Sequence, residues 1–85
     1  MMKELKETID LMTSADYKDR FKAEYWQLKI SAQKLNDMVN KYKAGTLDFT
    51  PTCPVELLET QLETMTSYLG ILFMRAAVEG VVVEG

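Results

Sequence analysis

The stretch YKDRFKAEYWQLKISAQKLNDMVNKY, residues 17–42, decides the fold. Its apolar residues recur at alternating spacings of four and three, which keeps them on one face of a helix. A stripe with this rhythm is typical of a helix that packs lengthwise against a second helix. The stripe consists of Phe21, Tyr25, Leu28, Ala32, Leu35, Val39 and Tyr42.

A second stripe with the same rhythm in the opposite phase follows in the C-terminal half of the chain. It consists of Val55, Leu58, Leu62, Met65, Leu69, Leu72 and Ala76. Two long helices joined by a short connector can bury both stripes by packing face to face. The sequence therefore predicts an all-α fold: an antiparallel, coiled-coil-like two-helix hairpin with a short N-terminal helix, assembled as a homo-oligomeric bundle.

The chain is expected to form one domain, residues 1–85, because a chain of this length supports a single small core. The expected segments are a leading helix at 2–12, a long helix at 15–44, a connector at 46–53, a long helix at 54–79 and a tail at 80–85.

Capping residues set the expected helix ends. Ser14 is a favourable N-cap for the first long helix, and Gly45 can adopt the left-handed conformation that ends it. Pro54 suits the first position of the next helix, which makes Cys53, or a threonine before it, the expected cap. In the connector, Leu47 and Phe49 are expected to point inward and plug the end of the hairpin.

Composition argues against several classes of function. The chain has no histidine and one cysteine. We therefore expect no disulfide within the chain, no zinc site and no recognisable set of catalytic residues. We expect no cofactor and no enzymatic activity. No run of about eighteen apolar residues occurs, so no membrane span is expected. Oligomerisation is the remaining source of additional burial.

Charge is unevenly distributed along the chain, whose net charge is −3. Residues 1–44 carry nine Lys and Arg against seven Asp and Glu, whereas residues 45–85 carry Arg75 against six acids. No block is basic enough for a nucleic acid polymer, whose binding rests on many phosphate contacts. A small anion held by a few local cations remains compatible with this pattern.

Both long helices carry apolar residues outside their stripes. The C-terminal helix has a second line of apolar residues: Leu57, Tyr68, Ile71 and Val78. On the first helix, Trp26 and Ile30 lie off the stripe. Such excess apolar surface predicts a second interface. Self-association is favoured here over coverage by the leading segment.

Two groups of residues are candidates for ligand binding. Arg75 lies among aromatic and aliphatic residues and suits phosphate or carboxylate binding, although a salt bridge to Glu79 is the more common role of such an arginine. On the first long helix, cations alternate with aromatic side chains that could stack on bases. The alternative is that Tyr25 belongs to the hydrophobic core and binds no ligand. Together the candidates are Arg20, Tyr25, Trp26, Lys29, Tyr68 and Arg75.

Three strings carry a resemblance to known proteins: FKAEYWQLK, LDFTPTCPVELLETQLETMTSYLGIL and RAAVEG. Together they make most of residues 12–80 look like a family of small phage-encoded helical-hairpin proteins of gut bacteria. The second helix is also loosely similar to the hairpin of phage anti-CBASS sponge proteins. The corresponding residues are Leu58, Thr60, Leu62, Glu63 and Met65.

The resemblance implies a function that composition and spacing do not reveal. The sponges are homo-oligomers that sequester cyclic nucleotide signals between protomers, and related phage sponges act on NAD-derived Thoeris signals. The implied function is anti-defence sequestration of a nucleotide immune signal without catalysis, in the cytoplasm of the bacterial host. The expected partners are other copies of the chain and a cyclic nucleotide or NAD-derived signal. A hairpin module that docks on a host or phage protein is the alternative.

Overall fold

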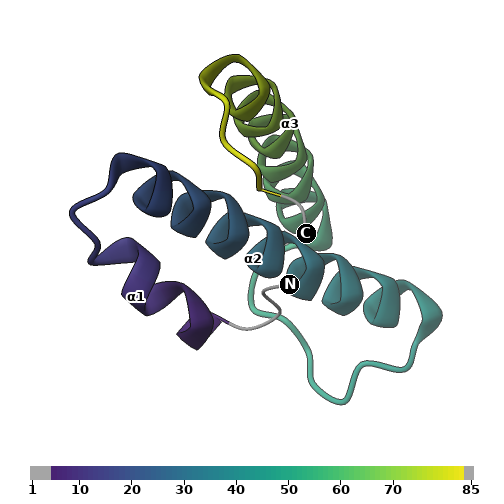
Figure 1. Ribbon diagram of the computed structural model, residues 1–85. Coiled ribbons are helices and arrows are strands. Elements are labelled where there is room, and N and C mark those ends of the chain that lie inside the picture. Colours follow the sequence, from purple (N-terminus) through teal and green to yellow (C-terminus); the bar gives the residue numbers. More distant parts are fainter. Residues whose placement is uncertain (1–4, 84–85) are drawn as a thin grey trace.

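The computed structural model describes residues 5–83 as a set of helices, with no strand in that range. A 3-10 helix η1 (Leu5–Thr8) leads into α1 (Ile9–Met12), and the long helices are α2 (Tyr17–Ala44) and α3 (Val55–Glu79). The molecule measures 43 × 24 × 20 Å (Figure 1). The predicted all-α fold with a long hairpin is confirmed. Residues 2–4 of the expected leading helix and residues 84–85 of the tail lie outside the described range.

Helix α2 begins at Tyr17, two residues later than the sequence predicted. Asp16, not Ser14, is the N-cap, and its carboxylate accepts a hydrogen bond from the backbone N–H of Lys18 at 2.9 Å. Ser14 instead organises the preceding turn, since its hydroxyl accepts from the Asp16 N–H and donates to Asp19. At the other end Gly45 takes the predicted left-handed conformation, with φ of 73°.

Helix α3 begins without a side-chain cap. Its N-cap residue is Pro54, so the expectation that Cys53 or a nearby threonine caps the helix is wrong. Pro54 has no side-chain acceptor, but its carbonyl accepts from the N–H groups of Leu57 and Leu58. The helix ends at Gly80, whose φ of 71° turns the chain back towards the helix.

The two long helices run antiparallel. Tyr17 at the start of α2 bonds Arg75 near the end of α3, whereas Lys43 at the end of α2 pairs with Glu59 near the start of α3. Between the helices lies a core whose central residue, Leu72, has no exposed surface. The stripe residues Phe21 and Tyr25 pack in this core, as the heptad rhythm predicted.

The leading segment covers a second face of α2. α1 lies on the side of α2 away from α3 (Figure 1) and packs on α2 alone of the two long helices. Buried Thr8 accepts a hydrogen bond from Gln27 at 3.0 Å. Ala23 and Ile30, which share this face with Gln27, are buried. The leading segment, rather than a neighbouring copy, therefore covers the face around Ile30.

The tail after Gly80 folds back over the core (Figure 1), so Val81 and Val83 are buried. The indole N–H of Trp26 donates to the Val83 carbonyl at 2.8 Å. The indole is only 6 % exposed, because a segment 57 residues away covers it. The prediction that Trp26 lies outside the hairpin core is therefore wrong, because the tail extends the core over it.

The connector between the long helices differs from the expected plug. Leu47 is half-buried, but 56 % of Phe49 is exposed. The prediction that Phe49 points into the end of the hairpin is wrong. Its ring instead lines a cavity that the connector forms with the C-terminal part of α2.

Candidate functional site

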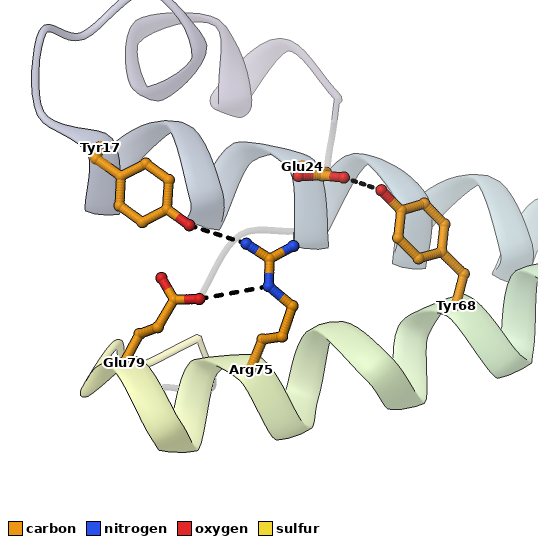
Figure 2. A network of polar contacts seen from close by, with 5 residues as sticks. All are labelled: Tyr17, Glu24, Tyr68, Arg75 and Glu79. Atoms are coloured by element: carbon orange, nitrogen blue, oxygen red, sulfur yellow. Dashed lines mark hydrogen bonds and ion pairs between the residues drawn. The ribbon is translucent and has the colours of Figure 1, made fainter.

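The interface between α2 and α3 has two edges of different character. One edge, here called the closed edge, is bridged by Tyr17 and Glu24 from α2 and by Tyr68, Arg75 and Glu79 from α3 (Figure 2). The other edge is hollowed into a groove. Predicted ligand residues lie on both edges, so the chemistry of each edge decides what they can do.

Arg75 is engaged within the closed edge. Its Nη2 donates to the Tyr17 hydroxyl at 2.9 Å, and its Nε donates to the Glu79 carboxylate at 3.3 Å (Figure 2). The guanidinium also lies over the Phe21 ring, 5.0 Å from its centroid. The salt bridge to Glu79 that the sequence offered as the alternative is therefore present. Both side chains are partly exposed, so solvent screens the pair.

The same contacts shift the ionisation of Tyr17. A side-chain hydrogen bond with Glu79, desolvation and the negative charge of Glu79 raise the pKa of Tyr17, while Arg75 acts in the opposite direction. Desolvation lowers the pKa of Arg75, but the nearby Tyr17 and Glu79 raise it by more, so the guanidinium stays charged. The cluster thus consists of the neutral phenol of Tyr17 and the carboxylate of Glu79, both of which accept hydrogen bonds from the charged guanidinium of Arg75.

Two further predicted residues also have partners in the chain. Tyr68 donates a hydrogen bond to Glu24 across the closed edge (Figure 2). Arg20 donates to the carbonyls of Ser14 and Ala15, at 3.0 and 2.9 Å, and so closes the turn before α2. Tyr68 thus joins α3 to α2, whereas Arg20 stabilises the turn that precedes α2.

Lys29 connects the core to the groove. Its ammonium lies 5.0 Å from the centroid of the Trp26 ring and 5.7 Å from that of Tyr25. The two rings meet edge to face at 5.7 Å and are both buried, so they hold the lysine through cation–π contacts. Of the six predicted residues, Lys29 lines the groove, with Tyr25 and Trp26 behind it.

The groove has a volume of about 360 Å³, within the range of small-molecule sites. Its apolar lining is Ala32 from α2 with Leu62 and Leu69 from α3. Its polar lining is Lys29, Gln33 and Asn36 from α2 with Thr66 from α3. The prediction missed Gln33, Asn36 and Thr66, although the spacing of Lys29, Gln33 and Asn36 places them in one row beside the stripe.

A larger cavity, of about 550 Å³, lies beside the connector. Lys34 and Lys41 line it together with Asp37 and Asp48, so its charges cancel. It also adjoins the C-terminal end of α2, where the helix dipole is negative. This cavity is therefore less suited to an anion than the groove.

An apolar surface remains exposed on the C-terminal half of α3, facing away from the core. Val78 is 87 % exposed and Met74 62 %, and Ile71 and Phe73 are each about half exposed. Thr66 and Phe73 are seven residues apart and so share a helix face, which means that this apolar surface begins where the groove ends. We call Ile71, Phe73, Met74 and Val78 the apolar α3 face.

Between residues 5 and 83, no group of three or more metal-ligating side chains is placed to hold a metal ion. No helix in the same range is both long and apolar enough to cross a membrane.

Comparison with known proteins identifies the family. The family model described as Sequestin matches residues 15–78, which takes in α2, the connector and nearly all of α3. The chain belongs to the Sequestin family. The family name denotes sequestration, a binding role rather than a catalytic one. Neither the curated proteins nor the solved structures contain a match to this Sequestin chain.

Proposed function

We propose that this Sequestin is a phage anti-defence protein that binds and sequesters a nucleotide immune signal without altering it. The signal would be a cyclic nucleotide or an NAD-derived molecule, held in pockets between copies of the chain. The observation that carries the proposal is the family match over residues 15–78, because it covers the whole hairpin on which the groove is built.

The chemistry of the groove suits a nucleotide. Lys29 provides a cation for a phosphate, while Ala32, Leu62 and Leu69 provide an apolar wall for a base. Amide and hydroxyl groups lie between them. A mostly apolar site with a few placed polar groups is the usual form of a small-molecule site.

The apolar α3 face supports assembly of copies. Water-exposed side chains such as Met74 and Val78 on a small soluble protein mark an interaction surface. Because this face begins beside Thr66, a second copy docked on it would cover the open side of the groove. Closure of this kind would remove a bound signal from solvent.

The other predicted ligand residues are proposed to act between copies. Arg20, Tyr68 and Arg75 do not reach the groove of their own chain, so a neighbouring copy would have to present them to the ligand. Tyr25 and Trp26 would contribute from behind, by holding Lys29 through their rings.

Titration calorimetry of the full chain tests the proposal, with cyclic dinucleotides, cyclic trinucleotides and cyclic ADP-ribose isomers as probes. We expect at least one to bind and to be released chemically unchanged, as chromatography of the denatured complex would show. Lys29→Gln should weaken binding about tenfold through loss of a charge-assisted contact. The matched change Lys18→Gln, on the exposed surface of α2, should not.

Absence of binding by every probe at tens of micromolar would exclude this function. The apolar α3 face favours one alternative, a module that docks on a host or phage protein. Native mass spectrometry separates the two, since a closed homo-oligomer that retains nucleotide supports sequestration. A nucleotide-free monomer that forms a stoichiometric complex with another protein supports the alternative.

A further inference from the structure

We propose that residues 81–83 form a strap that regulates the groove from outside it, by holding the Trp26 ring on which Lys29 rests. Docking of the strap and binding of an anionic signal at Lys29 are coupled, so that each favours the other. This inference rests on the proposed function and adds a means by which the affinity is set. The family match ends at residue 78, so the strap lies outside the part of the chain that the family model covers.

The strap is held at its two ends. The Val81 N–H donates to the Ala76 carbonyl at 2.9 Å, and the Val83 carbonyl accepts from the indole N–H of Trp26 at 2.8 Å. Val81 and Val83 are buried, whereas Val82 between them is 73 % exposed. A cavity of about 230 Å³ is lined by the strap and the C-terminal part of α3. A short segment with two anchor points and a cavity beside it can detach without unfolding the helices beneath it.

A continuous set of contacts joins the strap to the groove. The Val83 carbonyl holds the N–H edge of the indole, and the centroid of the same ring lies 5.0 Å from the Lys29 ammonium. Tyr25 meets the indole edge to face and lies 5.7 Å from that ammonium. Both rings are buried, whereas Lys29 lines the groove. The strap therefore reaches the groove through the indole and the lysine.

Release of the strap would weaken the hold on Lys29. Water would reach the indole, and a cation–π contact is weaker at a hydrated site than at a desolvated one. A lysine has a long, flexible side chain, so an ammonium without its ring support must be ordered when a phosphate binds. The docked strap removes that cost because it places the ammonium before the ligand arrives.

The coupling is reciprocal by thermodynamic necessity. If docking of the strap tightens ligand binding by a certain factor, the ligand tightens docking of the strap by the same factor. Couplings between sites in proteins usually amount to about fivefold or more. The strap and the groove can therefore be measured independently, and the two factors should agree.

Hydrogen exchange of the indole N–H measures the strap in the unaltered full chain. Trp26 is the single tryptophan, so NMR shows one indole signal, and its proton exchanges when the bond to Val83 opens. Saturation with a cyclic nucleotide or cyclic ADP-ribose isomer that binds should slow this exchange at least about fivefold. Trp26 does not line the groove, so the ligand does not shield the proton directly. Unchanged exchange would overturn the inference.

Substitutions in the strap measure the groove. The double change Val81→Ser and Val83→Ser should weaken binding of the same probe at least about fivefold in titration calorimetry. Val82→Ser is the matched control, since this side chain is exposed, and it should change the affinity by less than about twofold. Circular dichroism should show that each variant keeps its helices. Equal affinities of the two variants would overturn the inference and leave sequestration standing.

A double-mutant cycle shows whether the strap acts through Lys29 or through general stability. In the Lys29→Gln background, the double serine change should weaken binding by less than about twofold, because the side chain that the strap positions is already gone. A loss of the same size in both backgrounds would overturn the inference. Absence of binding by every probe would overturn both this inference and the proposed function.

Discussion

The two edges of the α2–α3 interface carry similar residues but differ in how those residues are satisfied. On the closed edge, Tyr17, Arg75 and Glu79 bond one another, and Tyr68 bonds Glu24. On the groove edge, the amides of Gln33 and Asn36 have no partner between residues 5 and 83. Cations and aromatic rings in a sequence therefore do not identify a binding site by themselves, because the folded chain can engage them, as it does with Arg75 and Tyr68 on the closed edge.

The core between the edges should show the largest effect. Leu72 is fully buried, so Leu72→Ala should lower the free energy of unfolding by about 2–5 kcal/mol through lost burial and a cavity. Chemical denaturation followed by circular dichroism measures this. Met74→Ala, on the exposed face of the same helix, should change it by less than about 0.5 kcal/mol. Equal losses in the two variants would contradict the assigned core.

The tail supports the groove edge indirectly, by covering the Trp26 ring on which Lys29 rests. The double change Val81→Ser and Val83→Ser should lower the free energy of unfolding by about 1–3 kcal/mol. It should also shift the fluorescence of Trp26, the single tryptophan, to longer wavelength as water reaches the indole. Val82→Ser, at an exposed position of the tail, should leave the spectrum unchanged.

A smaller change compares the edges directly. Tyr68→Phe removes the hydrogen bond to Glu24 and should lower the free energy of unfolding by about 0.5 kcal/mol, the low end expected at an exposed site. Gln33→Ala on the groove edge should not lower it, because the amide has no partner in the described chain and alanine favours the helix. Urea denaturation of both variants measures the difference, and a larger loss for Gln33→Ala would reverse the assignment of the edges.

The smallest effect concerns ionisation of the closed edge at high pH. The pKa of Tyr17 is raised, so above about pH 10 the folded state keeps a proton that the unfolded state has lost. The stabilisation from the neutral phenol is complete below that pH and disappears as pH rises through the folded pKa. Alkaline titration followed by phenolate absorbance should lose amplitude at the high-pH end of the curve in Tyr17→Phe relative to the parent chain. A loss confined to the low-pH end would contradict the network.

The positions of the helices follow from local sequence. The four-three rhythm that includes Phe21, Tyr25 and Leu72 predicted which helix faces meet, and all three residues are buried. Gly45 ends its helix in the predicted conformation. These features are predictable because helix periodicity and capping depend on residues only a few positions apart. Where several residues could cap, as with Ser14 and Asp16, the backbone decided the outcome: Asp16 accepts from the Lys18 N–H of the first turn, whereas Ser14 accepts from the Asp16 N–H before the helix.

Among the residues that line the groove, the sequence predicted Lys29 but not the neighbouring amides of Gln33 and Asn36. The sequence also predicted Arg75 as a ligand residue, but it could not show that this arginine bonds Tyr17. Whether Gln33 lines a groove or faces bulk water depends on how the two helices are rotated about their axes. Rotation is set by the packed core as a whole rather than by any short stretch. The apolar α3 face, in contrast, is predictable in part, because the spacing of Ile71 and Val78 places them outside the stripe, and both are exposed.

The sequence by itself determined two amphipathic helices, their antiparallel pairing and the breaks at Gly45 and Gly80, because each depends on local periodicity and backbone preference. Only the tertiary structure decided that the tail covers Trp26 and that the leading segment covers Ile30. Those contacts join residues far apart in the chain, and they form because the folded hairpin presents apolar surface that a nearby free segment can bury.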